Sequence, residues 1–169
     1  MSIGSRVVVT RFIELTSPKL MPWRDHVFSV VGTQPAQLMR SDPALTRAAS
    51  VWHLVSANNR PLARGAAIHE SVEDCFADAR QAIESACRMT VQLVEPDEHG
   101  PFAWYLTLAG ASVVTCSRWV PTVRDREHSI ALALASLATA KLRPTARLMN
   151  PSSMVRDDAP TVAANALSV

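Results

Sequence analysis

Residues 51–140 contain one short pattern twice, and this repetition constrains the fold more than any other feature of the chain. A fixed-period match that preserves both a strand pattern and a helix start is typical of repeated structural units. Trp52-His53-Leu54 and Trp104-Tyr105-Leu106 begin the two copies at an offset of 52, and an offset of 51 then aligns Leu62 with Val113, Ile68 with Trp119, Ser71 to Asp74 with Thr122 to Asp125, and Ile83 with Leu134.

Each copy predicts a hairpin followed by a capped helix. In the first copy, strands at 51–56 and 62–68 flank Asn58-Asn59, a pair that tolerates the left-handed backbone of a tight turn. In the second copy, a strand at 91–94 precedes strands at 102–108 and 112–120, which flank Gly110. Ser71 and Thr122 then stand where a side-chain oxygen would accept from a free amide of the first helical turn.

The two helices each show a single apolar stripe. Apolar residues recur at helical spacing at Val72, Phe76, Ala79, Ile83 and Ala86, and again at Val123, Ile130, Leu134 and Leu137. A single stripe allows a helix to cover one face of a sheet, so we expect one helix per repeat and an uncovered second sheet face. The predicted fold class is α+β, with two tandem ββ(β)α repeats and an antiparallel sheet.

The flanking segments are less regular. Residues 7–15 and 26–31 each predict a strand, the second closed by Gly32 and serving as the leading strand of the first copy. Residues 33–50 predict a loop, with a turn of helix at 36–40. Beyond Lys141, prolines and polar residues predict a flexible tail. The expected organisation is therefore an N-terminal segment at 1–50, repeats at 51–89 and 90–140, and a disordered tail at 141–169.

The repeat unit resembles a known family, the small YegP-like proteins of bacteria, which carry ββ(β)α units that often occur in tandem. The resemblance covers about residues 51–140 and rests on Trp52-His53-Leu54, Asn58-Asn59, Ile68 and the helix to Ala86, and on Phe102 to Leu106, Gly110, Ser117 to Trp119 and the helix to Leu137. A glycine frequent in the helices of that family is absent here, and residues 1–50 do not match. The resemblance implies a fold, and it implies no activity.

Composition points to an ordinary globular protein of a reducing compartment. Apolar residues make up 48% and charged residues 19% of the chain, and the net charge is +2. Residues 51–140 carry seven basic and ten acidic side chains, which disfavours a polyanion as the main partner. The three cysteines have no CxxC spacing, and no secretory signal or membrane span is visible. We expect a cytoplasmic protein.

No motif for catalysis or cofactor binding is present. With five glycines and no GxGxxG, GxxxxGK[ST], GxSxG or HExxH pattern, the sequence predicts no enzyme, no cofactor and no metal site. The five histidines stand alone. Cys116, expected opposite Trp104, is interpreted as a core residue, whereas Cys75 at a helix start is the better candidate for a lowered thiol pKa.

The functional hypothesis is a small interaction module. Its expected surface is the uncovered sheet face together with the N-terminal segment, with candidate residues Tyr105, Thr107, Thr115, Arg118, Trp119, Trp23 and Arg24. The expected partner is another protein or a second copy of this chain, giving a homodimer. The rival hypothesis is single-stranded nucleic-acid binding, in which the aromatic side chains stack on bases and Arg6, Arg11 and Arg24 contact phosphates.

Overall fold

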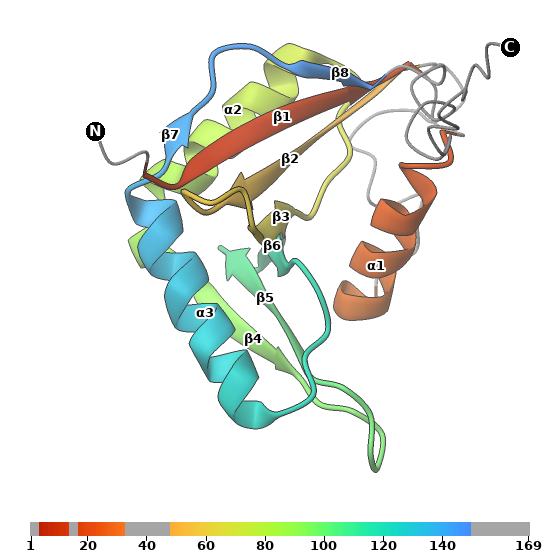
Figure 1. The fold of residues 1–169 in the computed structure, drawn as a ribbon, viewed down its shortest axis with the longest axis vertical. Coiled ribbons are helices and arrows are strands. Elements are labelled where there is room, and N and C mark those ends of the chain that lie inside the picture. Colours follow the sequence, from red (N-terminus) through yellow and green to blue (C-terminus); the bar gives the residue numbers. More distant parts are fainter. Residues whose placement is uncertain (1–3, 14–16, 33–47, 150–169) are drawn as a thin grey trace, which may run out of the picture.

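A computed structural model describes residues 4–13, 17–32 and 48–149. The described chain forms an α+β fold in which helices pack on one large mixed sheet (Figure 1). The elements in chain order are β1 (Arg6–Phe12), α1 (Met21–Val31), β2 (Ala49–Val55), β3 (Pro61–Gly65), α2 (Val72–Glu84), a short 3-10 turn (Ala86–Arg88), β4 (Thr90–Val94), β5 (Ala103–Leu108), β6 (Ala111–Cys116), α3 (Val123–Ala138), β7 (Lys141–Leu142) and β8 (Arg147–Met149). No helix in these ranges is long and apolar enough to cross a membrane.

The sheet joins the two predicted hairpins at its centre. Its strand order is β4-β5-β6-β3-β2-β1-β7, with β8 also paired to β1. The hairpins β2–β3 and β5–β6 are present as predicted, and their turns contain Asn59 at φ 61° and Gly110 at φ 81°. Strands β3 and β6 pair antiparallel, which makes one continuous sheet from both copies of the pattern.

The helices α2 and α3 begin where the sequence predicted. The hydroxyl of Ser71 accepts from the Asp74 amide at 3.0 Å, and that of Thr122 accepts from the Asp125 amide at 3.1 Å. Helix α2 contacts β1 and β2, whereas α3 contacts β3 and β5 as well. Of the predicted stripe on α3, Leu137 is fully buried and the side chains before it are partly or largely exposed.

The segment predicted as a strand at 26–31 is instead the second half of helix α1. Pro22 lies in the first turn of α1, where its missing amide costs no hydrogen bond, and Gly32 ends the helix in the left-handed region at φ 74°. Gly32 was interpreted as the end of a strand, because a glycine can end a strand as well as a helix. The leading strand of the first copy is β1, which pairs antiparallel with β2.

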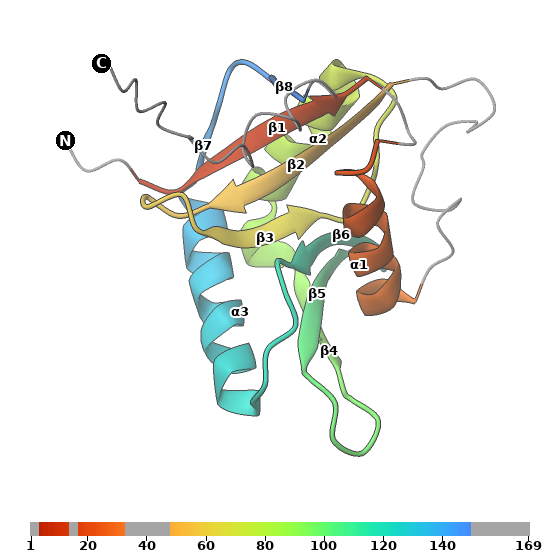
Figure 2. The same cartoon turned by 45° about the vertical axis from the view of Figure 1, so that its right-hand side comes forward.

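Helix α1 covers part of the second face of the sheet. Alternation along β2 directs Trp52 and Leu54 to the face that α2 covers, and Val51 and His53 to the opposite face. Residues of the α1 segment pack on that opposite face, where Leu20 joins Val51 in a buried cluster. Figure 2 shows α1 in front of the sheet and α2 behind it. The sequence predicted one helix per repeat and an uncovered second sheet face. This prediction is wrong for β5 and β6, because α1 contacts both strands.

The predicted flexible tail also needs correction. Residues 141–149 contain β7 and β8, and both strands pair with β1 in parallel. Strands of two or three residues are too short to show a periodic pattern in the sequence. They are strands because they pair with β1, which is distant in the chain. The predicted loop at 33–50 loses its last two residues to β2, while 33–47 and 150–169 lie outside the described residues.

Two buried tryptophans connect the sheet to its helices in matching ways. The indole of Trp52 donates to the Asp78 carboxyl on α2 at 2.8 Å, and the His69 ring lies 3.2 Å from the same oxygen. The indole of Trp104 donates to the Ser129 hydroxyl on α3 at 3.0 Å. Both rings are fully buried. Each copy thus uses its opening tryptophan to fix the position of its own helix.

The buried side chains of α3 should contribute more to the stability of the folded protein than its exposed side chains. Leu137 is 1% exposed and Leu132 is 42% exposed on the same helix. We expect Leu137→Ala to lower the free energy of unfolding by about 2–5 kcal/mol, because it removes a buried aliphatic side chain and leaves a cavity. Leu132→Ala should change it by less than about 0.5 kcal/mol. Urea denaturation of both variants measures this, and equal losses would contradict the helix orientation.

Candidate functional site

The structure separates the seven candidate residues into two groups. Tyr105 and Thr107 on β5 are half-buried, and Thr115 on β6 is fully buried beneath α1 with its hydroxyl unpartnered. Arg118 and Trp119 follow β6 and reach solvent to different degrees, while Trp23 and Arg24 belong to α1. The expected surface at Tyr105, Thr107 and Thr115 is therefore not open. Helix α1 packs on this part of the sheet. The sequence did not predict this packing, because the α1 segment has no clear helical period.

Helix α1 is attached to the sheet by three polar or aromatic contacts. The His26 ring lies 2.6 Å from the Cys116 carbonyl oxygen, and the Trp119 indole is 3.4 Å from the Ser29 hydroxyl. The third contact is a cation–π pair in which the Arg64 guanidinium lies 5.1 Å from the centre of the Trp23 ring. These contacts bring α1 beside the strand ends that carry Arg118 and Trp119.

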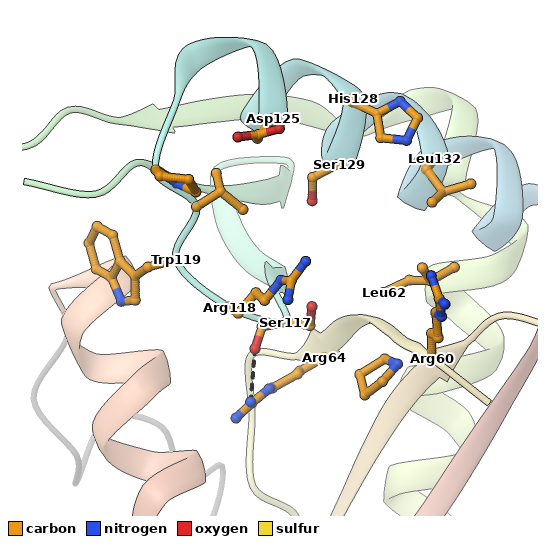
Figure 3. Close-up of a pocket in the computed structure, with 13 residues that line it drawn as sticks. Arg60, Leu62, Arg64, Ser117, Arg118, Trp119, Asp125, His128, Ser129 and Leu132 are labelled. Atoms are coloured by element: carbon orange, nitrogen blue, oxygen red, sulfur yellow. Dashed lines mark hydrogen bonds between the residues drawn. The ribbon is translucent and has the colours of Figure 1, made fainter. Parts of the chain in front are cut away.

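Arg118 and Trp119 line a cleft of about 820 Å³ (Figure 3). The cleft, named here the arginine cleft, lies between the start of β3, the segment that follows β6 and the first turns of α3. Its lining residues are Arg60, Pro61, Leu62, Arg64, Ser117, Arg118, Trp119, Val120, Pro121, Asp125, His128, Ser129 and Leu132. It therefore combines basic, hydroxyl and apolar side chains from both copies of the sequence pattern.

Local sequence explains the walls of the arginine cleft. Strand β6 ends at Cys116, and the chain then runs through Pro121 to the helix cap at Thr122. The Thr122 hydroxyl also donates to the Asp125 carboxylate at 2.7 Å. The isolated bridge between Phe102 and Val120 holds this segment against the sheet. The single carboxylate of the cleft is thus engaged at the start of α3, where the helix dipole favours it.

The arginine cleft carries an excess of positive charge. Three arginines line it, and among the described residues Arg60, Arg64 and Arg118 have no carboxylate within ion-pair distance. Arg64 donates to the Ser117 carbonyl at 2.8 Å, and burial lowers the pKa of its guanidinium. The Ser117 carbonyl and the Trp23 ring satisfy Arg64, so Arg60 and Arg118 are the exposed cations of the cleft that have no ion-pair partner among the described residues.

A neighbouring histidine lies beside Arg64 in the sheet. His53 on β2 pairs directly opposite Arg64 on β3, on the face of the sheet that α1 partly covers. Burial lowers the pKa of His53, and the nearby charges of Arg64 and Arg147 lower it further. His53 is therefore held in its neutral form, as repulsion between adjacent cations requires.

Trp119 also borders a second, shallower hollow of about 560 Å³. Its other lining residues are Ser29, Val94, Glu95, Pro96, Asp97, Gly100 and Pro101, which come mainly from the turn between β4 and β5. This turn is acidic. Trp119 therefore lies between the basic cleft and the acidic hairpin turn, and it borders both.

The sequence did not identify Arg60, Arg64 or His128 as site residues. Arg60 and Arg64 lie on the first hairpin, more than fifty residues before Arg118, and no local spacing connects them. The buried contact of His69 with Asp78 was also missed, because a spacing of nine residues matches no known motif. Within the described residues no group of three or more histidine, cysteine, aspartate or glutamate side chains could hold a metal ion.

Comparisons with known proteins give little beyond the fold. No known family model matches the chain, and no curated protein matches it. One similar solved structure is the solution NMR structure of YegP from E. coli, a protein of unknown function. The match has 16% sequence identity and a TM-score of 0.42, and it covers 62% of this chain and 86% of YegP. This identity does not show membership of a YegP-like family.

The three thiols should differ sharply in reactivity. Cys75 and Cys116 are buried and Cys87 is exposed. Burial raises the pKa of Cys75 and Cys116, so the lowered pKa expected for Cys75 at the helix start is not found. We expect iodoacetamide to modify Cys87 alone in the native protein and all three thiols after unfolding. Mass spectrometry of the labelled peptides measures this, and rapid native labelling of Cys116 would contradict the packing.

His53 should make stability depend on pH. Its pKa is lowered from 6.5 in the folded state, so the unfolded chain binds more protons at mildly acidic pH. The free energy of unfolding should therefore fall as pH drops below 6.5, and His53→Gln should make this dependence less steep. The exposed His99 provides the matched comparison, since His99→Gln makes the same substitution at an exposed turn position. Urea denaturation across this pH range tests the difference.

Proposed function

We propose that this protein is a non-catalytic cytoplasmic interaction module that binds an acidic segment of a partner protein in the arginine cleft. The observation that carries the proposal is that Arg60, Arg64 and Arg118 line one cleft, and none of them has a carboxylate within ion-pair distance among the described residues. A guanidinium presents a planar set of donors that matches a carboxylate, and it remains charged at any physiological pH. An acidic side chain is the simplest group that would complete these contacts.

Apolar residues in the arginine cleft favour a peptide over a bare anion. Leu62, Leu132 and Val120 line it beside the arginines, and the Trp119 ring forms part of its wall. Aromatic and arginine side chains are enriched in protein interfaces because they combine contact area with directed hydrogen bonds. A segment that alternates acidic and apolar side chains would match both parts of the lining.

The charge distribution supports one localised contact. Residues 51–140 have seven basic side chains against ten acidic ones, yet three of those seven line the arginine cleft. An extended polyanion would pass over the surrounding acidic surface and be repelled there. A short acidic segment would meet only the cleft.

We also propose that the two copies are true tandem repeats and that the arginine cleft lies at their junction. The first repeat would be β1-β2-β3-α2, with α1 inserted after β1, and the second would be β4-β5-β6-α3. Support comes from the matching helix caps and from the matching bonds of Trp52 to α2 and Trp104 to α3. Arg60 and Arg64 belong to the first repeat, whereas Arg118 belongs to the second.

A second candidate function is single-stranded nucleic-acid binding. Trp119 and Arg118 are adjacent at the cleft and could stack on a base and contact its phosphate. The sequence alone placed this binding on a sheet face that α1 partly covers in the structure. Arg6 and Arg11 lie on β1, and neither lines the cleft. The acidic surroundings make this function the weaker of the two.

Binding to a defined acidic peptide tests the proposed function. The probe is a fluorescein-labelled peptide of alternating glutamate and leucine, titrated by fluorescence anisotropy beside a labelled oligothymidylate at low and high salt. We expect the peptide to bind more tightly than the oligonucleotide. Arg60→Ala and Arg118→Ala should each weaken peptide binding about tenfold, as expected for loss of a hydrogen bond to a charged group.

Arg80→Ala provides the matched control for the peptide titration. Arg80 is exposed on α2 and does not line the cleft, so its replacement changes the net charge equally. Equal weakening by all three variants would indicate a general charge effect and contradict a specific site. Tighter binding of the oligonucleotide, with a steep loss at high salt, would favour the nucleic-acid function instead.

A further inference from the structure

The hairpin formed by β4 and β5 projects away from the body of the protein (Figure 1). Its turn contains Glu95, Asp97 and Glu98 between β4 and β5, together with Pro96 and Pro101. The Gly100 amide donates to the Asp97 carbonyl at 3.1 Å. Two prolines and this internal hydrogen bond limit the conformations of the turn. The hairpin therefore presents its acidic residues on a preorganised tip, and little entropy would be lost when it binds.

The base and the tip of this hairpin differ in how their charges are satisfied. At the base, Arg126 donates to the Glu95 carboxylate at 2.9 Å and to the Val94 carbonyl at 3.3 Å. At the tip, Asp97 and Glu98 are exposed, and neither forms an ion pair with any described residue. The tip thus carries two uncompensated negative charges on a segment whose base is anchored to α3.

The same chain therefore displays an acidic projection and a basic cleft of complementary charge. We propose that the acidic segment that occupies the arginine cleft is the β4–β5 hairpin tip of a second copy of this chain. Asp97 and Glu98 of one copy would contact Arg60 and Arg118 of the other. This inference rests on the proposed function, because it names the partner of the same cleft.

The position of Trp119 favours a reciprocal pair. This side chain borders both the arginine cleft and the hollow beside the hairpin turn, so the two features are neighbours on one side of the molecule. Two copies related by a twofold axis can then exchange hairpins in a single approach, with each tip in the other's cleft. Such an isologous contact closes on itself and gives a dimer.

Charge reversal on each side of the proposed contact provides the test. Arg60→Glu with Arg118→Glu alters the cleft alone, and Asp97→Arg with Glu98→Arg alters the hairpin tip alone. All four residues are exposed, so both double variants should fold, which circular dichroism verifies. Light scattering at low salt should show a dimer for the wild-type protein, and each double variant should self-associate at least about tenfold more weakly.

Mixing the two double variants is the decisive measurement. Every contact between the two different chains then joins opposite charges again, so the mixture should recover the wild-type mass, and high salt should dissociate it. The exposed pair Glu73→Arg with Arg80→Glu on α2 is the matched control and should remain dimeric. A wild-type monomer at every concentration, or a mixture that stays monomeric, would overturn the proposal.

The peptide titration separates this inference from the proposed function. If the acidic peptide binds the cleft while the wild-type protein stays monomeric, the second copy is not the partner and the proposed function stands. If neither the peptide nor a second copy binds, both proposals are wrong. A dimer that survives both charge reversals would show that the copies associate through another surface.

Discussion

The indole of Trp52 lies against the backbone of Gly65, and much of the structure depends on this close approach. A Cβ atom at Gly65 would stand 2.6 Å from the indole nitrogen, so only glycine leaves room for the ring. Gly65 belongs to β3, the strand that joins the two hairpins into one sheet. The indole nitrogen also donates to Asp78 on α2, whose carboxyl lies within reach of His69. One buried polar cluster therefore fixes the central strand, the first packed helix and the chain that leaves β3.

The second hairpin also bonds to its helix through a tryptophan, but with a different partner residue. On the offset of 51, Asp78 corresponds to Ser129 and His69 corresponds to Val120. Trp104 still bonds to its helix through Ser129, but no histidine and carboxyl pair closes the site beside it. The cleft residues Ser129 and Val120 are smaller than Asp78 and His69, which stand at the matching positions of the sequence pattern.

The sequence predicted the elements whose signals are local and missed those that depend on distant contacts. The turns at Asn59 and Gly110 and the helix caps depend on a few adjacent residues, and all of them are present in the structure. Helix α1 was missed because it is rich in β-branched and aromatic residues, and its helical state is stabilised by burial of Val27 and Val30 against a distant sheet. For the site, Arg118 and Trp119 were identified and Arg60 and Arg64 were not, since only the pairing of β3 with β6 brings the two pairs together.

Helix α3 determines which charges are satisfied within the molecule and which remain available. Its Arg126 is 4% exposed, lies 5.1 Å from the centre of the Phe102 ring and bonds to Glu95 at the base of the hairpin. This buried cation holds the base of the hairpin against α3, and loss of Glu95 would leave the Arg126 charge without its ion-pair partner. Arg118, just before the same helix, has no such partner among the described residues and faces the cleft instead. Two arginines close together in the sequence therefore differ in role: the buried Arg126 pairs with Glu95 at the base of the hairpin, and the exposed Arg118 lines the cleft.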